Sequence, residues 1–96
     1  MSSFPSRAYY NIRYASHAGS WYEDDENALD DQLSGWIREA NQDTNSNPVR
    51  PVKALIGPHA GFSYSGPTAA FAYKGVDPSL YSRVFVLGPS HCVYLE

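Results

Sequence analysis

Two histidines in matching contexts are the residues of this chain best suited to chemistry. His59 ends the segment Ala-Leu-Ile-Gly-Pro-His, and His91 ends Phe-Val-Leu-Gly-Pro-Ser-His, 32 positions later (91 − 59). Two converging neutral imidazoles are good ligands for Zn, Cu, Fe or Ni, and imidazole also exchanges protons near neutral pH. The pattern predicts either one shared functional site, or two histidines that each hydrogen-bond only the turn in which they lie.

A third ligand is less clearly indicated. A catalytic metal usually needs three protein ligands, and the candidates are His17, Cys92 or a residue that this chain lacks. His17 lies in a Ser-His-Ala-Gly-Ser turn, and the alternative to a ligand role is that it stabilises this turn. Cys92 directly follows His91, and because consecutive side chains tend to point apart, joint ligation by both is disfavoured. Ser90 is not in a Gly-x-Ser-x-Gly context, which disfavours serine hydrolase chemistry.

Aromatic residues flank the histidine turns. They are Trp21, Tyr22, Phe62 and Tyr64. They either pack the core and cover the end of a sheet, or they wall a pocket and offer an aromatic face to a peptide or a ring.

Helices and apolar runs alternate along the chain and must position these residues. An apolar stripe with helical spacing predicts a helix over 23–42, with acidic residues crowding its first turn. A polar, proline-containing loop follows, and then the apolar run Val52–Ile56, a short helix over Ser65–Tyr73 and a second apolar run, Arg83–Leu87. Strands that alternate with helices indicate βαβ units and a parallel sheet. His59 and His91 then leave the carboxyl ends of two parallel strands, where open α/β sheets bind ligands.

Length and composition exclude several classes of protein. The 96 residues, 43% of them hydrophobic, allow at most one small globular domain. The net charge of −3 and the scattered basic residues disfavour nucleic-acid binding. No apolar run approaches the roughly 20 residues that span a bilayer. Cys92 is the only cysteine, so a reducing cytoplasmic location is expected.

Three motifs together resemble the Memo family. They are Ala-Ser-His-Ala-Gly-Ser-Trp-Tyr at 15–22, Pro-His-Ala-Gly-Phe-Ser-Tyr-Ser-Gly at 58–66 and Leu-Gly-Pro-Ser-His at 87–91. Ala-Tyr-Lys at 72–74 and Val-Asp-Pro-Ser at 76–79 also fit. The order and spacing match over about residues 14 to 95, and three motifs in register make the resemblance specific.

The resemblance implies a fold and a function. Memo proteins resemble class III non-haem iron ring-opening dioxygenases, with an α/β/α layered arrangement around a mainly parallel central sheet. Eukaryotic members are linked to receptor tyrosine kinase signalling, phosphotyrosine-peptide binding, the cytoskeleton and cell motility. They are also described as copper- or iron-binding proteins whose redox activity yields reactive oxygen species. The metal-site histidines of the family correspond to His59 and His91, and its pocket aromatics to Trp21 and Tyr64, with His17 beside them.

The chain also departs from the family pattern. The residue after the last histidine is commonly a second histidine, and here it is Cys92. Family members run to about three hundred residues, and a later Asp-x-x-His segment and a cysteine that complete the pocket have no counterpart. We therefore expect an irregular tail over 1–14 and a partial domain over 15–96, containing only the N-terminal βαβ part and truncated on its C-terminal side.

Three functions are compatible with these observations. The first is redox-linked signalling and motility control through a metal held by His59 and His91. The second is a binding module without catalysis, in which Trp21, Tyr64 and His17 hold a phosphotyrosine peptide of a receptor tyrosine kinase. The third is an unstable fragment with no activity of its own. No catalytic residue is assigned.

Overall fold

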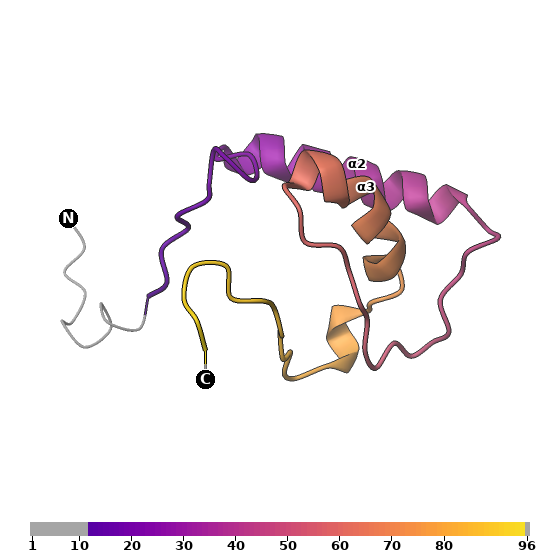
Figure 1. Ribbon diagram of the computed structural model, residues 1–96. Helices are drawn as coiled ribbons and strands as arrows, with labels where there is room; N and C mark the ends of the chain where they lie inside the picture. Colours follow the sequence, from indigo (N-terminus) through magenta and orange to yellow (C-terminus); the bar gives the residue numbers. More distant parts are fainter. Residues whose placement is uncertain (1–11, 96) are drawn as a thin grey trace.

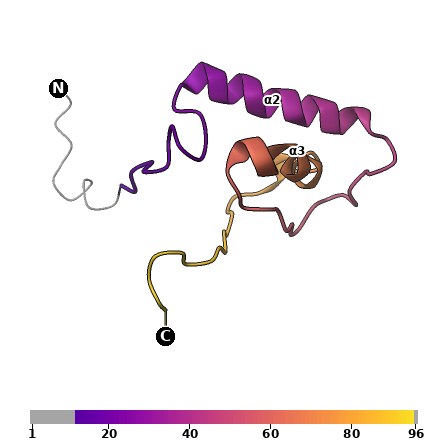
Figure 2. The ribbon, with the colours of Figure 1, turned by 45° about the horizontal axis from the view of Figure 1, so that its top comes forward.

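A pair of packed helices organises the chain. The computed structural model describes residues 12–95. The elements in chain order are helix α2 (Glu26–Gln42), helix α3 (Phe62–Tyr73) and the short 3-10 helix η1 (Pro78–Leu80). Figure 1 shows α3 packed against α2, with long connecting segments on the side of α3 away from α2. In Figure 2 α3 is viewed nearly along its axis while α2 runs across the view, so the two helices cross. The two predicted helices are therefore present, and the segments around them position the histidines.

Helix α2 begins where a carboxylate caps it. Asp25 has an extended backbone, and its side chain accepts a hydrogen bond from the N–H of Ala28 at 2.8 Å, which satisfies a free donor of the first turn. The predicted end at Gln42 is confirmed. The predicted start at residue 23 is wrong by three residues, because the capping carboxylate is Asp25 and the acidic residues before it precede the helix.

Helix α3 begins three residues before the predicted start at Ser65. The N–H of Phe62 donates to the carbonyl of Trp21 at 2.7 Å, so a distant segment satisfies the first donor of the helix. Pro67 consequently lies inside the helix. Because proline has no N–H, the carbonyl of Ser63 loses its helical hydrogen bond.

The buried core lies between α2 and α3 and is small. Ala40 and Ala70 are its buried apolar residues among those described. Gly66 lies against the ring of Trp36, and a Cβ added at Gly66 would lie 2.0 Å from Cζ3 of that ring. The absence of a side chain at Gly66 therefore allows the two helices to approach.

The two apolar runs predicted as strands have no regular structure and are not paired. Over residues 12–95 the only β-type pairing is an isolated parallel bridge between Ala18 and Tyr22. Val52–Ile56 and Arg83–Leu87 form no ladder with each other or with another described segment. The α/β/α arrangement with a parallel sheet thus stays a prediction.

The ends of the chain add no further element. Most of the predicted tail over 1–14, namely residues 1–11, lies outside the described residues, and 12–14 have no regular structure. Among the helices of residues 12–95, none has the length and apolar character needed to cross a membrane.

Candidate functional site

His59 and His91 lie next to each other. Their ring centroids are 5.5 Å apart, with an angle of 36° between the ring planes. Both side chains are exposed. Two segments separated by a helix and two loops therefore bring two imidazoles within reach of one bound group.

A second contact explains how the two segments align. The hydroxyl of Tyr81 donates a hydrogen bond to the carbonyl of Val52, which joins the beginnings of the two apolar runs. The contact between His59 and His91 joins the loops that follow their ends. The two segments therefore run in the same direction, although no ladder of hydrogen bonds connects them.

A tight turn presents His17 and Trp21. The carbonyl of His17 accepts the N–H groups of Ser20 at 3.0 Å and Trp21 at 2.9 Å, and also the hydroxyl of Ser20 at 2.9 Å. Gly19 has a φ of +85°, a left-handed conformation that glycine adopts without steric cost. Gly19 and Ser20 of this motif thus serve to close the turn.

The turn is hydrogen-bonded to the start of α3, and the ring of Trp21 in the turn lies beside His91. The hydrogen bond from Phe62 to the carbonyl of Trp21 holds the two motifs together. The Trp21 ring lies 5.4 Å from His17 and 6.4 Å from His91, between centroids. The rings of His17, Trp21, His91 and His59 form a continuous series, which we call the ring array.

Two other residues considered from the sequence, Tyr64 and Cys92, are exposed. Tyr64 is 84% exposed on α3 and, among the described residues, makes no ring contact with the array. Cys92 is a free, exposed thiol. Tyr22 pairs with Phe62 at 5.2 Å, so these two aromatics pack together rather than facing the histidines.

The donor set fits a metal in part. Two adjacent imidazoles suit copper or iron as ligands. Within residues 12–95, however, no group of three or more His, Cys, Asp or Glu side chains is placed to hold a metal ion. His59 and His91 thus supply two protein ligands, whereas a catalytic metal site usually has three.

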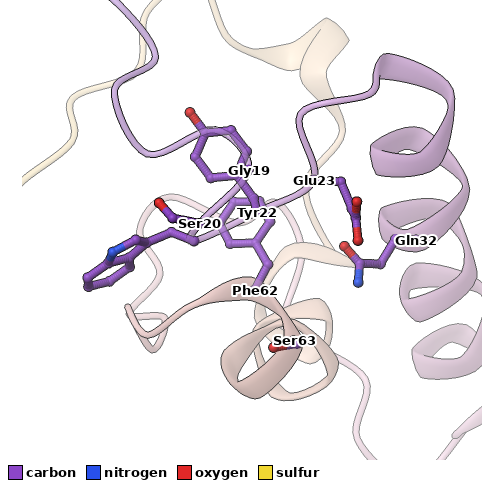
Figure 3. A pocket seen from close by; sticks show the side chains of 8 residues that line it. Gly19, Ser20, Tyr22, Glu23, Gln32, Phe62 and Ser63 are labelled. Atoms are coloured by element: carbon purple, nitrogen blue, oxygen red, sulfur yellow. The ribbon is translucent and has the colours of Figure 1, made fainter.

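A small pocket beside the ring array is lined by residues of two of the motifs, at 19–22 and 62–63, together with Glu23 and Gln32. It has a volume of about 130 Å³ and lies between the turn at 19–23, α2 and the start of α3. Figure 3 shows the side chains of Glu23 and Gln32 close together, on the side of the pocket next to α2. Oε1 of Gln32 is buried without a hydrogen-bond partner. The sequence does contain a signal for Gln32, which is helical spacing: position 32 falls on the apolar face of the helix, between Leu29 and Trp36.

Comparison with known proteins identifies relatives. The Memo-like protein family matches residues 13–96. Protein MEMO1 of Xenopus laevis and Protein MEMO1 of Homo sapiens are each 53% identical to this chain over 84 residues, which are 88% of this chain and 27% of each relative. The protein memo-1 homolog of Caenorhabditis elegans is 51% identical over 87 residues, 90% of this chain and 23% of its own length. The chain thus spans about a quarter of these relatives. No solved structure matches it significantly.

Proposed function

The chain belongs to the Memo-like protein family, and from this membership we propose that it binds copper or iron through His59 and His91. The observation that carries the proposal is the 5.5 Å separation of the two rings, in loops that follow two segments running in the same direction. Both ligands are exposed, so an ion reaches them from solvent without a change in the packed helices.

The biological role follows from the family resemblance. We assign the chain to redox-linked signalling in the cytoplasm that controls the cytoskeleton and cell motility. The metal, when bound, supplies one-electron redox chemistry of the kind that yields reactive oxygen species. The part played by this chain is to hold the ion at His59 and His91 and to place the ring of Trp21 beside it.

A copper(II) titration by calorimetry tests the metal assignment. We expect saturable binding by the chain and a loss of affinity of about tenfold or more, or about 1.4 kcal/mol, in the His59→Ala/His91→Ala double variant. His17→Ala is the matched control, because it removes an exposed imidazole of the same array that lies one ring further away. Equal affinity in the chain and the double variant would contradict the assignment.

A phosphotyrosine-peptide site is the second candidate. It is favoured by the partly exposed ring of Trp21, 43% accessible, lying between His17 and His91. An aromatic face with imidazoles on both sides suits a phosphorylated ring, and Tyr64 lies exposed on the neighbouring helix. Fluorescence polarisation with one receptor tyrosine kinase peptide, phosphorylated and unphosphorylated, tests this role. Trp21→Ala is expected to abolish the preference for the phosphorylated form, whereas indistinguishable affinities for the two peptides would exclude it.

A further inference from the structure

The small pocket beside the ring array holds two oxygen acceptors that no described residue satisfies. Within residues 12–95, Oε1 of Gln32 is buried without a hydrogen-bond partner. Over the same residues, the carboxylate of Glu23 forms no hydrogen bond and no ion pair. The two side chains lie close together on the side of the pocket next to α2 (Figure 3). A buried acceptor without a donor is unfavourable, so this pair of oxygens is arranged for a donor that the described residues do not supply.

The two acceptors select the chemistry of the group that occupies the pocket. Two neighbouring oxygens accept from a group that carries at least two polar hydrogens, and a carboxylate favours a group with a positive charge. Glu23 is the one residue of the described lining with a full charge at neutral pH. A hard metal ion fits poorly, because Mg²⁺ and Ca²⁺ take about six or more oxygen ligands. The acceptors therefore suit an ammonium or a guanidinium group.

The aromatic wall and the size of the pocket favour guanidinium. Tyr22 and Phe62 border the pocket, and their ring centroids are 5.2 Å apart. A planar guanidinium stacks on aromatic rings and donates to two oxygens at once, whereas an ammonium is a compact, strongly hydrated point charge. The volume of about 130 Å³ is below the roughly 300–1,000 Å³ of pockets that enclose a whole ligand. The pocket thus holds the end of a side chain and leaves the rest of the ligand outside.

We propose that this pocket binds a guanidinium group of the kind that arginine carries, and we call it the guanidinium site. The bound group donates hydrogen bonds to the Glu23 carboxylate and to Oε1 of Gln32, and its plane lies against the aromatic wall. His59 and His91, the proposed metal ligands, do not border the pocket. The guanidinium site is therefore separate from the proposed metal site and does not depend on a bound ion.

An NMR titration of the full, nitrogen-15-labelled chain tests the proposal. The probe is the peptide acetyl-Gly-Arg-Gly-amide, and we expect saturable shifts of the side-chain amide of Gln32 with a Kd of about 1 mM or lower. The same peptide with citrulline in place of arginine should bind about tenfold or more weakly, because citrulline keeps the planar shape and loses the charge. The lysine peptide should bind about threefold or more weakly, because an ammonium lacks the planar fork.

The end group alone identifies the source of the ligand. Methylguanidinium carries the guanidinium without a peptide chain. Weaker binding of methylguanidinium than of the arginine peptide would assign the guanidinium site to an arginine within a polypeptide. Equal binding of the two would assign it to a free guanidinium compound.

Charge-removing substitutions separate the pocket from its surroundings. Glu23→Gln should weaken binding of the arginine peptide by about tenfold or more. Glu26→Gln is the matched control, because Glu26 belongs to the same acidic segment at 23–26 and does not border the pocket. This control should change the Kd by less than about twofold, since exposed charges contribute little.

Gln32→Leu adds a readout in the absence of ligand. Removing a buried acceptor that has no donor should raise the midpoint of thermal unfolding of the free chain and weaken peptide binding by about threefold or more. A lower midpoint would show that Gln32 is hydrogen-bonded inside the free chain and would overturn the proposal. Any of four binding results would also overturn it: no saturable shift at Gln32, equal affinity for the arginine and citrulline peptides, tighter binding of the lysine peptide, or equal losses in Glu23→Gln and Glu26→Gln.

Discussion

The ammonium nitrogen of Lys74 lies 2.9 Å from the carbonyl oxygen of Ala40, across 34 residues of sequence. The same nitrogen donates to the carbonyl of Asp43 at 3.0 Å and lies 5.2 Å from the ring centroid of Phe71. Lys74 is buried directly after α3, and it adds a donor to carbonyls at the carboxyl end of α2, where the Ala40 carbonyl also accepts the N–H of Asp43. Its positive charge also suits the negative end of the α2 dipole.

Lys74→Met should therefore destabilise the helix pair. The substitution keeps the length of the side chain but removes both hydrogen bonds, and it leaves the buried carbonyls with fewer partners, at a cost of about 1–3 kcal/mol. Urea unfolding followed by circular dichroism measures the change. Lys53→Met, at an exposed position, is the control and should change the free energy of unfolding by less than about 0.5 kcal/mol. Equal midpoints for the two variants would contradict the role assigned to Lys74.

Gly66→Ala should lower stability, although alanine is the better helix former. A Cβ at position 66 would lie 2.0 Å from the Trp36 ring, so the helices must separate, at a cost of about 1–3 kcal/mol. Gly35→Ala in α2 is the matched control, because its Cβ meets nothing within 4 Å. That variant should gain about 0.5–1 kcal/mol from helix propensity alone. If both variants were stabilised in thermal unfolding, the close packing of Gly66 on Trp36 would be refuted.

Local sequence signals predict the helices better than their boundaries. The apolar stripe predicts α2 and its end at Gln42, because helical spacing is a property of neighbouring residues. The start of α3 depends on the bond from Phe62 to Trp21, which joins residues 41 positions apart (62 − 21) and leaves no local pattern. Strand pairing is similarly non-local, so the apolar content of Arg83–Leu87 cannot by itself specify a partner.

The candidate site is likewise predictable from the sequence only in part. The repeated apolar run, Gly-Pro and histidine predict that His59 and His91 converge, and the two rings do lie together. The place of Trp21 between His17 and His91 comes from the fold of a turn and has no signal in spacing. Tyr64, matched by its motif, is exposed and makes no ring contact with the array among the described residues, since a motif fixes the order of residues but not the contacts of a side chain.

Asp77 should contribute stability that depends on pH. Its carboxylate accepts hydrogen bonds from the hydroxyl of Ser79 at 2.7 Å and from the N–H of Ser79 at 3.0 Å. The Ser79 hydroxyl, followed by its N–H, lowers the pKa of Asp77 below the ordinary value. A lowered folded pKa means that the contribution is present above the unfolded pKa and is lost as the pH falls through the folded pKa, which is below about pH 4.

Carbon-13 NMR of the side-chain carboxyl measures this effect. The midpoint for Asp77 should lie below that of a free aspartate, and Ser79→Ala should move it upward, since both the hydroxyl donor and part of the turn geometry are removed. Ser82→Ala is the control for loss of a nearby hydroxyl and should leave the midpoint in place. A midpoint of Asp77 that Ser79→Ala does not raise would show that the hydrogen bond from the Ser79 hydroxyl does not form in solution.

Copper(II) at the histidine pair should quench the fluorescence of Trp21. The Trp21 ring lies 6.4 Å from His91, and a paramagnetic ion held between His59 and His91 would quench an indole at that range strongly. Trp36 packs on Gly66 between the helices and serves as an internal reference. We expect saturable quenching in the parent chain, and Trp21→Phe should remove most of the quenchable signal. His17→Ala should retain the quenching, whereas His59→Ala/His91→Ala should abolish its saturable part. Saturable quenching that persists in the double variant would place the ion nearer His17, at the opposite end of the ring array, and would contradict the assignment of His59 and His91 as ligands.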